Sequence, residues 1–300
     1  MGLIEKAGGA FGDIPDAANE LAPAPETGGE PAPFDINFEA LAASGFYTPA
    51  GRANRLSLEL RAIKRRLLRR LGLRNSAGER RMTRRGGRNR NLVLVTSSRP
   101  GEGKTFCAIN LALSLACEEQ LEVLLVDADA PRPKVRATFG LPQGPGLSDR
   151  LRDPAIPALS VCRRARQAPL TIMSEGGPVD RAGELYGSAQ AQRLFTELSA
   201  RRPGGLVIID APPALATEEA IILARHVDEV IFIIEADATP EVAAGAALDE
   251  MLEANPNVSL VLNRCLVSGG AAYYGSYDDY DRVRDSGTTQ PIRQDEGKQE

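Results

Sequence analysis

The chain has 300 residues, 43% of them hydrophobic, and its wide polar flanks favour a single globular domain of roughly 200 residues over two domains. No apolar run approaches the ~20 residues of a membrane-spanning helix, and the N-terminus lacks a signal peptide's basic start and apolar centre, so we expect a cytoplasmic protein. A single histidine, His226, argues against imidazole metal sites and His-based triads, and four scattered cysteines without a CxxC pair indicate reduced, mostly core thiols.

The first 90 residues divide by composition into two parts. Residues 1–35 are rich in Ala, Pro, Gly and Glu and are predicted to be disordered. Residues 36–90 are predicted to form a basic amphipathic helix followed by a linker. The apolar stripe of this helix could pack on the following domain, on a partner or on a membrane surface. The stripe comprises Leu56, Leu60, Ile63, Leu67 and Leu71.

The net charge of −4 conceals the strongly basic character of the stretch from Arg52 to Arg90. A solvated linker, an anionic membrane surface or an acidic partner would each account for these charges. Nucleic acid is a less favoured partner, because no stacking aromatic residues are interleaved with the arginines.

From residue 91 the pattern changes to short β-rich runs alternating with helical ones, which predicts one α/β domain over residues 91–268. Such alternation implies a mainly parallel sheet covered by helices on both faces. After Cys265 the apolar pattern stops, and residues 269–300 are predicted to form a disordered tail. The predicted strands cover residues 92–96, 123–126, 159–162, 170–173, 206–209, 230–234 and 259–262.

The stretch SSRPGEGKT, from Ser97 to Thr105, lies between a predicted strand and a predicted helix and has the pattern of a phosphate-binding loop. Its glycines let backbone N–H groups surround a phosphate, and the helix directs its positive N-terminus at the same charge. Lys104 is placed to reach the β- and γ-phosphates of a nucleotide, and Thr105 offers a hydroxyl to Mg²⁺. Ser98 stands where such a motif usually begins with glycine.

Two further predicted strands end on aspartates, in VLLVDADAPRP and LVIIDAPP. Ligands of open α/β sheets bind beyond the carboxyl ends of the strands, so we expect Asp127, Asp129 and Asp210 near the phosphate-binding loop. Asp210 fits the carboxylate that holds Mg²⁺ through water. Asp127 and Asp129 are either turn-forming residues or a Mg²⁺ ligand and a group that orients, or takes a proton from, the attacking atom.

The order of TSSRPGEGKT, LLVDADAPRP and VIIDAPP resembles the bacterial tyrosine kinases, whose fold is shared with the MinD/ParA ATPases. Loops of that family read S-x-x-P-G-E-G-K-[ST], so a serine at position 98 is expected there. The resemblance extends from about Phe38 to Tyr280. It includes LAASGFYTP and LELRAIKRRLL, which are similar to the N-terminal part of the cytoplasmic autokinases tied to exopolysaccharide export. A P-loop NTPase fold of the MinD/ParA-like type is therefore implied.

The resemblance implies an ATP-dependent protein-tyrosine kinase that uses Mg²⁺ and phosphorylates its own C-terminal tyrosines in trans, within a ring of protomers. It also implies regulation of exopolysaccharide assembly and export, and activation by a membrane polysaccharide co-polymerase of the chain-length determinant type. A tail with incidental aromatic residues is the alternative to a phosphorylated one. The candidate acceptors are Tyr273, Tyr274, Tyr277 and Tyr280.

The resemblance also assigns roles to individual residues. Arg132 is a candidate for stabilising charge near the transferred group, with an ordinary surface arginine as the alternative. Asn263 stands at the position that faces the adenine in relatives, although an asparagine that ends a strand is also a common cap. The catalytic candidates are Lys104, Asp127, Asp129 and Arg132, and the metal ligands are Thr105, Asp127 and Asp210. The nucleotide-binding candidates are Ser98, Pro100, Gly101, Glu102, Gly103, Lys104, Thr105, Phe106 and Asn263.

The assembly motif of this chain departs from the family pattern, whereas two other features separate the chain from the MinD/ParA ATPases. The assembly motif E-x-x-R-x-x-R has Leu58 in place of the glutamate and Lys64 in place of the second arginine, which weakens the case for ring formation by that contact. The competing function is a MinD/ParA-like ATPase that acts as a membrane- or DNA-associated positioning switch. That group carries a lysine where this chain has Arg99 and lacks a terminal tyrosine cluster, so both features favour the kinase.

Overall fold

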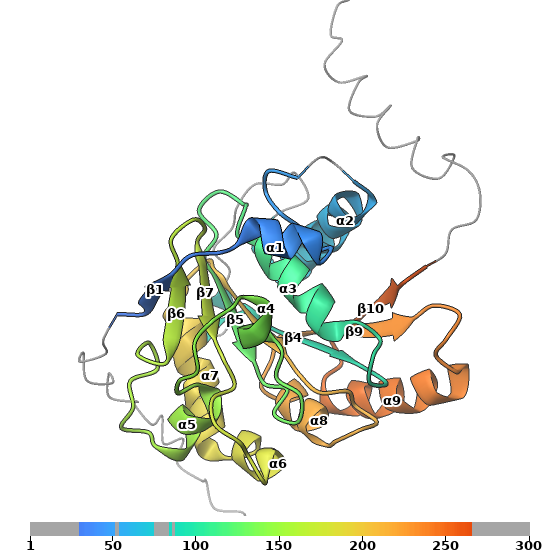
Figure 1. Cartoon of the computed structure of the whole chain (residues 1–300). Helices are drawn as coiled ribbons and strands as arrows, with labels where there is room; N and C mark the ends of the chain where they lie inside the picture. The colour runs from blue at the N-terminus through green and yellow to red at the C-terminus, as the bar shows by residue number, and fades with distance from the viewer. Residues whose placement is uncertain (1–29, 52–53, 75–83, 86–87, 266–300) are drawn as a thin grey trace, which may run out of the picture.

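The structure, a computed structural model, describes residues 30–51, 54–74, 84–85 and 88–265 (Figure 1). Its centre is an eight-stranded sheet in the order β1-β6-β7-β5-β8-β4-β9-β10. Every neighbouring pair is parallel except β6 and β7, which confirms the predicted mainly parallel sheet. The strands are β1 (Ala32–Phe34), β4 (Leu92–Ser97), β5 (Val123–Asp127), β6 (Cys162–Ala165), β7 (Leu170–Met173), β8 (Leu206–Asp210), β9 (Glu229–Glu235) and β10 (Val258–Asn263). A separate antiparallel pair joins β2 (Arg84–Arg85) to β3 (Arg88–Asn89).

Helices cover both faces of the sheet and create two hydrophobic cores. Figure 1 shows α1, α2 and α3 over one face, with α5 to α9 over the other. The helices are α1 (Phe38–Ala43), α2 (Arg55–Arg70), α3 (Lys104–Leu115), α4 (Val135–Thr138), α5 (Leu147–Arg152), α6 (Ala182–Tyr186), α7 (Ala189–Ala200), α8 (Glu219–Ala224) and α9 (Glu241–Ala254). None of the helices in the described ranges is long and apolar enough to cross a membrane.

The central strands are continuous apolar runs because both of their faces are covered. Along β4, Leu92 and Leu94 pack into the core under α5 to α9, whereas Val93 and Val95 pack into the core under α1 to α3. This alternation is the two-residue period of an extended strand, and it is filled by hydrophobic residues on both sides. Since neither face of β4 is exposed to solvent, its sequence lacks the alternation of polar and apolar residues that marks a half-exposed strand.

The prediction that residues 1–35 are disordered is wrong for Ala32–Phe34, which forms β1 and pairs in parallel with β6. Phe34 is buried, and its ring lies edge-on to that of Phe139 with centroids 6.1 Å apart. Just beyond the strand, Arg166 forms an ion pair with Asp35 at 2.6 Å. A short apolar segment at the end of a Pro- and Gly-rich stretch therefore gains order from contacts with residues more than 100 positions away.

The apolar stripe of α2 packs on the following domain, which was one of the three alternatives for it. Leu60, Leu67 and Leu71 are buried, and α2 lies against α3. Lys64 on the same helix is also buried: its Nζ forms an ion pair with Glu118 at 2.7 Å and donates to the carbonyl of Ser114 at 3.2 Å. The lysine at the degenerate assembly-motif position is thus engaged within its own chain.

One predicted helix is broken in two. The apolar periodicity of residues 182–201 predicts a single helix, whereas the structure has α6 and α7 there, with a break at Gly187 and Ser188. The Ser188 side chain accepts a hydrogen bond from the backbone N–H of Ala191 at 3.2 Å, which is the N-cap arrangement that starts a new helix. A serine after a glycine is a capping signal that the apolar periodicity alone does not reveal.

Candidate active site

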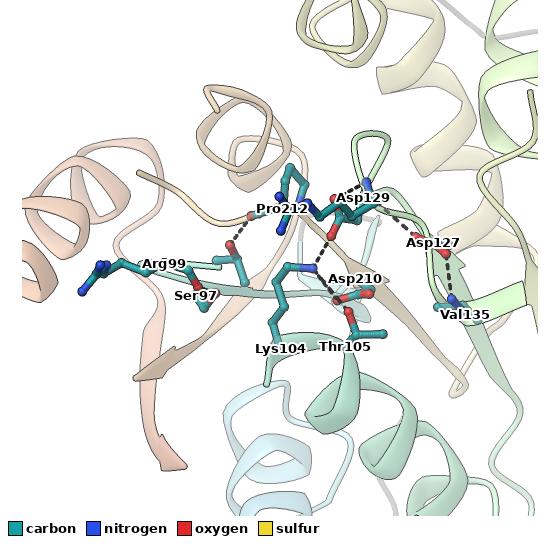
Figure 2. Close-up of polar contacts among 11 residues, drawn as sticks. Ser97, Arg99, Lys104, Thr105, Asp127, Asp129, Val135, Asp210 and Pro212 are labelled. Carbon is teal, nitrogen blue, oxygen red and sulfur yellow. Dashed lines mark hydrogen bonds and ion pairs between the residues drawn. The ribbon is translucent and has the colours of Figure 1, made fainter. Parts of the chain in front are cut away.

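Three adjacent strands deliver the predicted site residues to one edge of the sheet. β8 lies between β5 and β4, and Asp127 at the end of β5 is the register partner of Asp210 at the end of β8. β4 ends next to them at Ser97 and leads directly into the phosphate-binding loop. Figure 2 shows Lys104, Thr105, Asp127, Asp129 and Asp210 gathered at this edge. The strand ends predicted from three separate motifs are therefore neighbours in space.

The phosphate-binding loop turns on two glycines with left-handed backbone conformations. Gly101 has φ +94° and Gly103 has φ +95°, values that residues with a Cβ rarely adopt. A Cβ on Gly101 would meet nothing within 4 Å, whereas one on Gly103 would lie 2.2 Å from Nδ2 of Asn263. Gly103 is also the N-cap of α3, so the loop ends where that helix presents its free N–H groups.

Ser98 stands where the motif usually has its first glycine, and its side chain forms a hydrogen bond within the loop. Ser98 is buried, and its hydroxyl lies 2.8 Å and 3.0 Å from the two carboxylate oxygens of Glu102, to which it donates. The backbone N–H of Arg99 donates to the same carboxylate at 2.9 Å. The serine therefore contributes a hydrogen bond that glycine could not make.

Lys104 lies among carboxylates. Its Nζ forms a buried ion pair with Asp129, lies 3.8 Å from Oδ1 of Asp210 and donates to the hydroxyl of Thr105 at 3.3 Å (Figure 2). A lysine in this position can exchange one of these carboxylates for a phosphate oxygen with little movement of its backbone. These contacts bring Lys104 together with Asp129 and Asp210, two of the three aspartates expected near the phosphate-binding loop.

Asp127 is fully buried and held by two backbone donors. The N–H of Asp129 donates to its Oδ1 at 3.2 Å, and the N–H of Val135 donates to its Oδ2 at 2.9 Å. Burial, followed by the negative charge of Asp210, raises the pKa of Asp127 to about 7, although the two backbone donors lower it. Asp127 is thus a carboxylate of fixed orientation that is able to take up a proton near neutral pH.

Asp210 is fully buried, and neither of its carboxylate oxygens has a hydrogen-bond partner among the described residues. Burial raises its pKa to about 6, while the positive charge of Lys104 opposes this rise. A buried carboxylate without hydrogen bonds is costly unless a cation or a bound water compensates it. Together with the Thr105 hydroxyl, this oxygen-rich and unsatisfied donor set fits a hard cation such as Mg²⁺.

Other predicted residues lie at the site without facing the aspartates. Arg132 donates its backbone N–H to Oδ1 of Asp129 at 3.2 Å, but its side chain is exposed. The Phe106 ring contacts that of Phe46, with centroids 5.0 Å apart. Pro100 is exposed beside Arg99, whose side chain points away from Lys104 in Figure 2. The candidate acceptors Tyr273, Tyr274, Tyr277 and Tyr280 lie outside the described residues.

Asn263 contacts the phosphate-binding loop itself. It lies at the end of β10, and its Nδ2 donates to the carbonyl of Glu102 at 2.8 Å. The same amide group lies against Gly103 and accounts for the lack of room for a side chain there. The predicted contact with adenine remains a prediction, whereas this support of the loop is a contact that the sequence did not indicate.

Three residues near the site were not anticipated. Thr239, which follows β9, donates its hydroxyl to Glu102 at 2.5 Å. Glu175, which follows β7, is buried and accepts a hydrogen bond from the hydroxyl of the fully buried Tyr186 at 2.9 Å. Burial is the main cause that raises the pKa of Glu175 to about 8, and the charge of Asp127 raises it further. Each residue stands alone in a loop or short helix, where no motif marked it.

Gly103→Ala is expected to weaken nucleotide binding much more than Gly101→Ala. Both changes force a Cβ into a left-handed conformation, at about 1–2 kcal/mol each, but only the first also collides with Asn263. Titration of the folded variants with Mg·ATP measures the difference. Adding Asn263→Ala to Gly103→Ala should recover part of the loss, and equal affinities of the two single variants would contradict the collision.

Known proteins with similar sequences are tyrosine-protein kinases. No family model matches the chain. It is 29% identical over 191 residues to the tyrosine-protein kinase YwqD of Bacillus subtilis, covering 63% of this chain and 79% of that relative. It is 25% identical over 188 residues to the putative tyrosine-protein kinase CapB of Staphylococcus aureus, covering 62% and 81%.

A solved kinase domain is also similar to this chain, in both fold and sequence. The crystal structure of the VpsO kinase domain superposes with a TM-score of 0.57 and 27% identity, covering 70% of this chain and 94% of that domain. The matching fold, the phosphate-binding loop and the kinase relatives are consistent with one another. The chain is therefore similar to the bacterial tyrosine-protein kinases, and it has a P-loop NTPase fold of the MinD/ParA-like type.

Proposed function

We propose that this chain is an ATP- and Mg²⁺-dependent protein-tyrosine autokinase that phosphorylates its own C-terminal tyrosines. The observation that carries the proposal is the convergence of Lys104, Thr105, Asp127, Asp129 and Asp210 at the carboxyl ends of β4, β5 and β8. A phosphate-binding loop beside several carboxylates supplies the positioning and electrostatic stabilisation on which phosphoryl transfer depends.

The loop would bind the phosphates of ATP. The backbone N–H groups from Gly101 to Lys104 and the N-terminus of α3, whose N-cap is Gly103, would surround one phosphate. Lys104 would leave Asp129 for the β- and γ-phosphates, because a phosphate carries more negative charge than the carboxylate that it replaces. Asp129 would still orient Asp127 through its backbone N–H.

Thr105 and Asp210 would hold Mg²⁺, with Asp127 beside them. When bound, the ion would neutralise charge on the phosphate oxygens. The unsatisfied oxygens of Asp210 support this assignment, because a cation would supply the partner that the protein does not. The role of Arg132 as a further source of positive charge stays a proposal that requires its exposed side chain to turn toward the transferred group.

Asp127 is the proposed proton acceptor. The tyrosine hydroxyl has a pKa near ~10 and is therefore protonated when it approaches. Its oxygen forms a new bond to the γ-phosphorus, the bond from that phosphorus to the bridging oxygen breaks, and ADP leaves with the electron pair. The tyrosine proton passes to Asp127, whose backbone donors fix the orientation of the receiving oxygen. Little nucleophile charge is needed, since the transition state is loose.

The acceptors and partners follow from the sequence and the family. The proposed acceptors are Tyr273, Tyr274, Tyr277 and Tyr280, which are modified in trans within a homo-oligomer. The kinase is proposed to regulate exopolysaccharide assembly and export from the cytoplasm. Its proposed activator is a membrane polysaccharide co-polymerase, which would bring the kinase to the membrane. The basic face of α2 is available for an anionic membrane surface, since its outward arginines are exposed.

Intact-mass and phosphopeptide measurements after incubation with Mg·ATP test the proposal. Wild type is expected to gain phosphate on the four tail tyrosines. Lys104→Met is expected to lower the rate of this phosphorylation by on the order of a thousandfold. Replacing all four tail tyrosines by phenylalanine should remove the phosphate while ATP binding persists. Tyr47→Phe, a half-buried tyrosine outside the tail, should change nothing.

The same measurements distinguish the kinase from a positioning ATPase. An active ATPase whose tail stays unmodified, even with its membrane partner present, would overturn the kinase proposal. A switch of the MinD/ParA kind would instead show ATP-dependent dimerisation and release from a membrane or DNA on hydrolysis.

A further inference from the structure

Glu102 presents a carboxylate in the middle of a loop proposed to bind phosphates. A negative charge at such a position would repel the ligand unless it were turned away and compensated. Glu102 is 3% exposed, so its charge is removed from the solvent that would otherwise screen it. The carboxylate must therefore be compensated by donors of the protein itself.

Three donors reach this carboxylate from two different parts of the chain. Oε1 accepts from the hydroxyl of Thr239 at 2.5 Å and from that of Ser98 at 2.8 Å, while Oε2 accepts from the backbone N–H of Arg99 at 2.9 Å. Ser98 and Arg99 belong to the loop, but Thr239 is 137 residues away in the sequence. We call Ser98, Glu102 and Thr239 the carboxylate brace.

The direction of the Thr239 hydrogen bond is set by its surroundings. Its hydroxyl oxygen accepts from the backbone N–H of Glu235 at 3.2 Å, so its one proton is directed to Glu102. Thr239 lies in the connection between β9 and α9, and β9 is the sheet neighbour of β4, from which the phosphate-binding loop begins. A fixed strand therefore anchors the donor that holds the loop.

We propose that Thr239 is a positioning residue for nucleotide binding, because through the carboxylate brace it holds the phosphate-binding loop in the shape that receives the phosphates of ATP. The inference rests on the proposed function. Glu102 is flanked by Gly101 and Gly103, both of which have left-handed backbone conformations. A glycine on each side gives the backbone freedom to turn, so an anchored side chain between them restricts it.

The backbone of Glu102 is anchored as well as its side chain. Its carbonyl accepts from Asn263 at the end of β10, the sheet neighbour of β9. The side chain of this central loop residue is thus held by the connection after β9, the sheet neighbour of the loop's own strand, and its carbonyl is held from β10, the next strand outward. Loss of the Thr239 proton would leave Oε1 with Ser98 alone and allow the carboxylate, with its charge, to turn toward the phosphate site.

The test compares Thr239→Val, which keeps the shape of the side chain and removes its hydroxyl, with Thr239→Ser, which keeps the hydroxyl. The dissociation constant and the KM for Mg·ATP of Thr239→Val are expected to rise about tenfold, as for the loss of one hydrogen bond to a charged group. Thr239→Ser should return both to within about threefold of wild type. Thr196→Val, at an exposed threonine of α7 that donates to the carbonyl of Gln192, is the matched control and should leave both unchanged.

Each outcome bears on a different claim. An unchanged dissociation constant in folded Thr239→Val, or a loss that Thr239→Ser does not restore, would overturn the positioning role and leave the kinase proposal intact. Failure of wild type to bind Mg·ATP would overturn the proposed function itself. If Thr239→Val does not fold, Ser98→Ala removes the other hydroxyl of the brace and is expected to weaken binding similarly; unaltered affinity there would contradict the brace.

Discussion

Asp210→Asn is expected to lower the rate of tyrosine phosphorylation by at least about a hundredfold while raising the free energy of unfolding. Asp210 is the buried carboxylate whose oxygens have no hydrogen-bond partner among the described residues. The proposed Mg²⁺ site loses a negative charge in this variant, whereas the fold loses a buried anion whose oxygens have no hydrogen-bond donor among the described residues. Rate assays and chemical denaturation of the same preparation measure the two effects.

The gain in stability should depend on pH in a defined direction. The pKa of Asp210 in the folded protein is raised to about 6, so its contribution to stability is fully present below the unfolded pKa near 4 and is lost as the pH rises through 6. The advantage of Asp210→Asn over wild type should therefore grow from pH 4 to 6 and level off above, at on the order of 2–3 kcal/mol.

Asp127→Asn is the matched control for this trade between activity and stability. Asp127 accepts hydrogen bonds from two backbone N–H groups, so an asparagine would turn its own amide donor toward one of them. This variant is expected to lose activity, and its unsatisfied buried donor, at about 1–3 kcal/mol, should offset much of the stability gained by removing a carboxylate whose pKa is raised to about 7. A destabilised Asp210→Asn, or equal stability changes in the two variants, would contradict the assignment of Asp210 as the carboxylate without hydrogen-bond donors.

Glu175→Gln is expected to produce the largest pH-dependent change in stability outside the proposed catalytic residues. Burial raises the pKa of Glu175 to about 8, far above its unfolded value of 4.5. The stability that wild type derives from protonated Glu175 is present below pH 4.5 and is lost as the pH rises through 8. The free energy of unfolding of Glu175→Gln relative to wild type should therefore increase by on the order of 2–4 kcal/mol between pH 5 and pH 8.

The groups around Glu175 determine the controls for this measurement. Asp127 and Asp149 raise its pKa, whereas the hydroxyl of Tyr186 and the charge of Arg152 lower it. Tyr186→Phe should thus move the loss of stability to higher pH. Glu184→Gln, at an exposed glutamate of α6, should leave the pH dependence unchanged. A stability difference between Glu175→Gln and wild type that is constant from pH 5 to pH 9 would contradict the raised pKa.

Much of the site was predictable because its residues occupy fixed places in local motifs. The phosphate-binding loop lies between a strand and a helix, and Asp127 and Asp210 each end a continuous apolar strand. Parallel strands bring their carboxyl ends to one edge, so local patterns were sufficient to predict that these residues meet. The sheet type followed from the same alternation of strands and helices.

The contacts of Glu102, Glu175 and Lys64 were not predictable in this way. The sequence pattern identifies Glu102 only as a residue of a phosphate-binding motif, but its carboxylate accepts a hydrogen bond from a threonine 137 positions away. Glu175 reads as a loop acid, although it is buried against Tyr186. Lys64 reads as part of a solvated basic face, although it is paired with Glu118 inside the fold. Each has a partner on another element, which no local period reveals.

The amino-acid sequence by itself determined the chemistry that gathers at the sheet edge, because the spacing of glycine, lysine, threonine and aspartate along strand ends decides which groups can meet there. Only the tertiary structure decided how those groups are charged and held. Burial and long-range hydrogen bonds, which depend on how distant segments pack, set the pKa of Asp210 and Glu175 and turn the Glu102 carboxylate into a support for the loop.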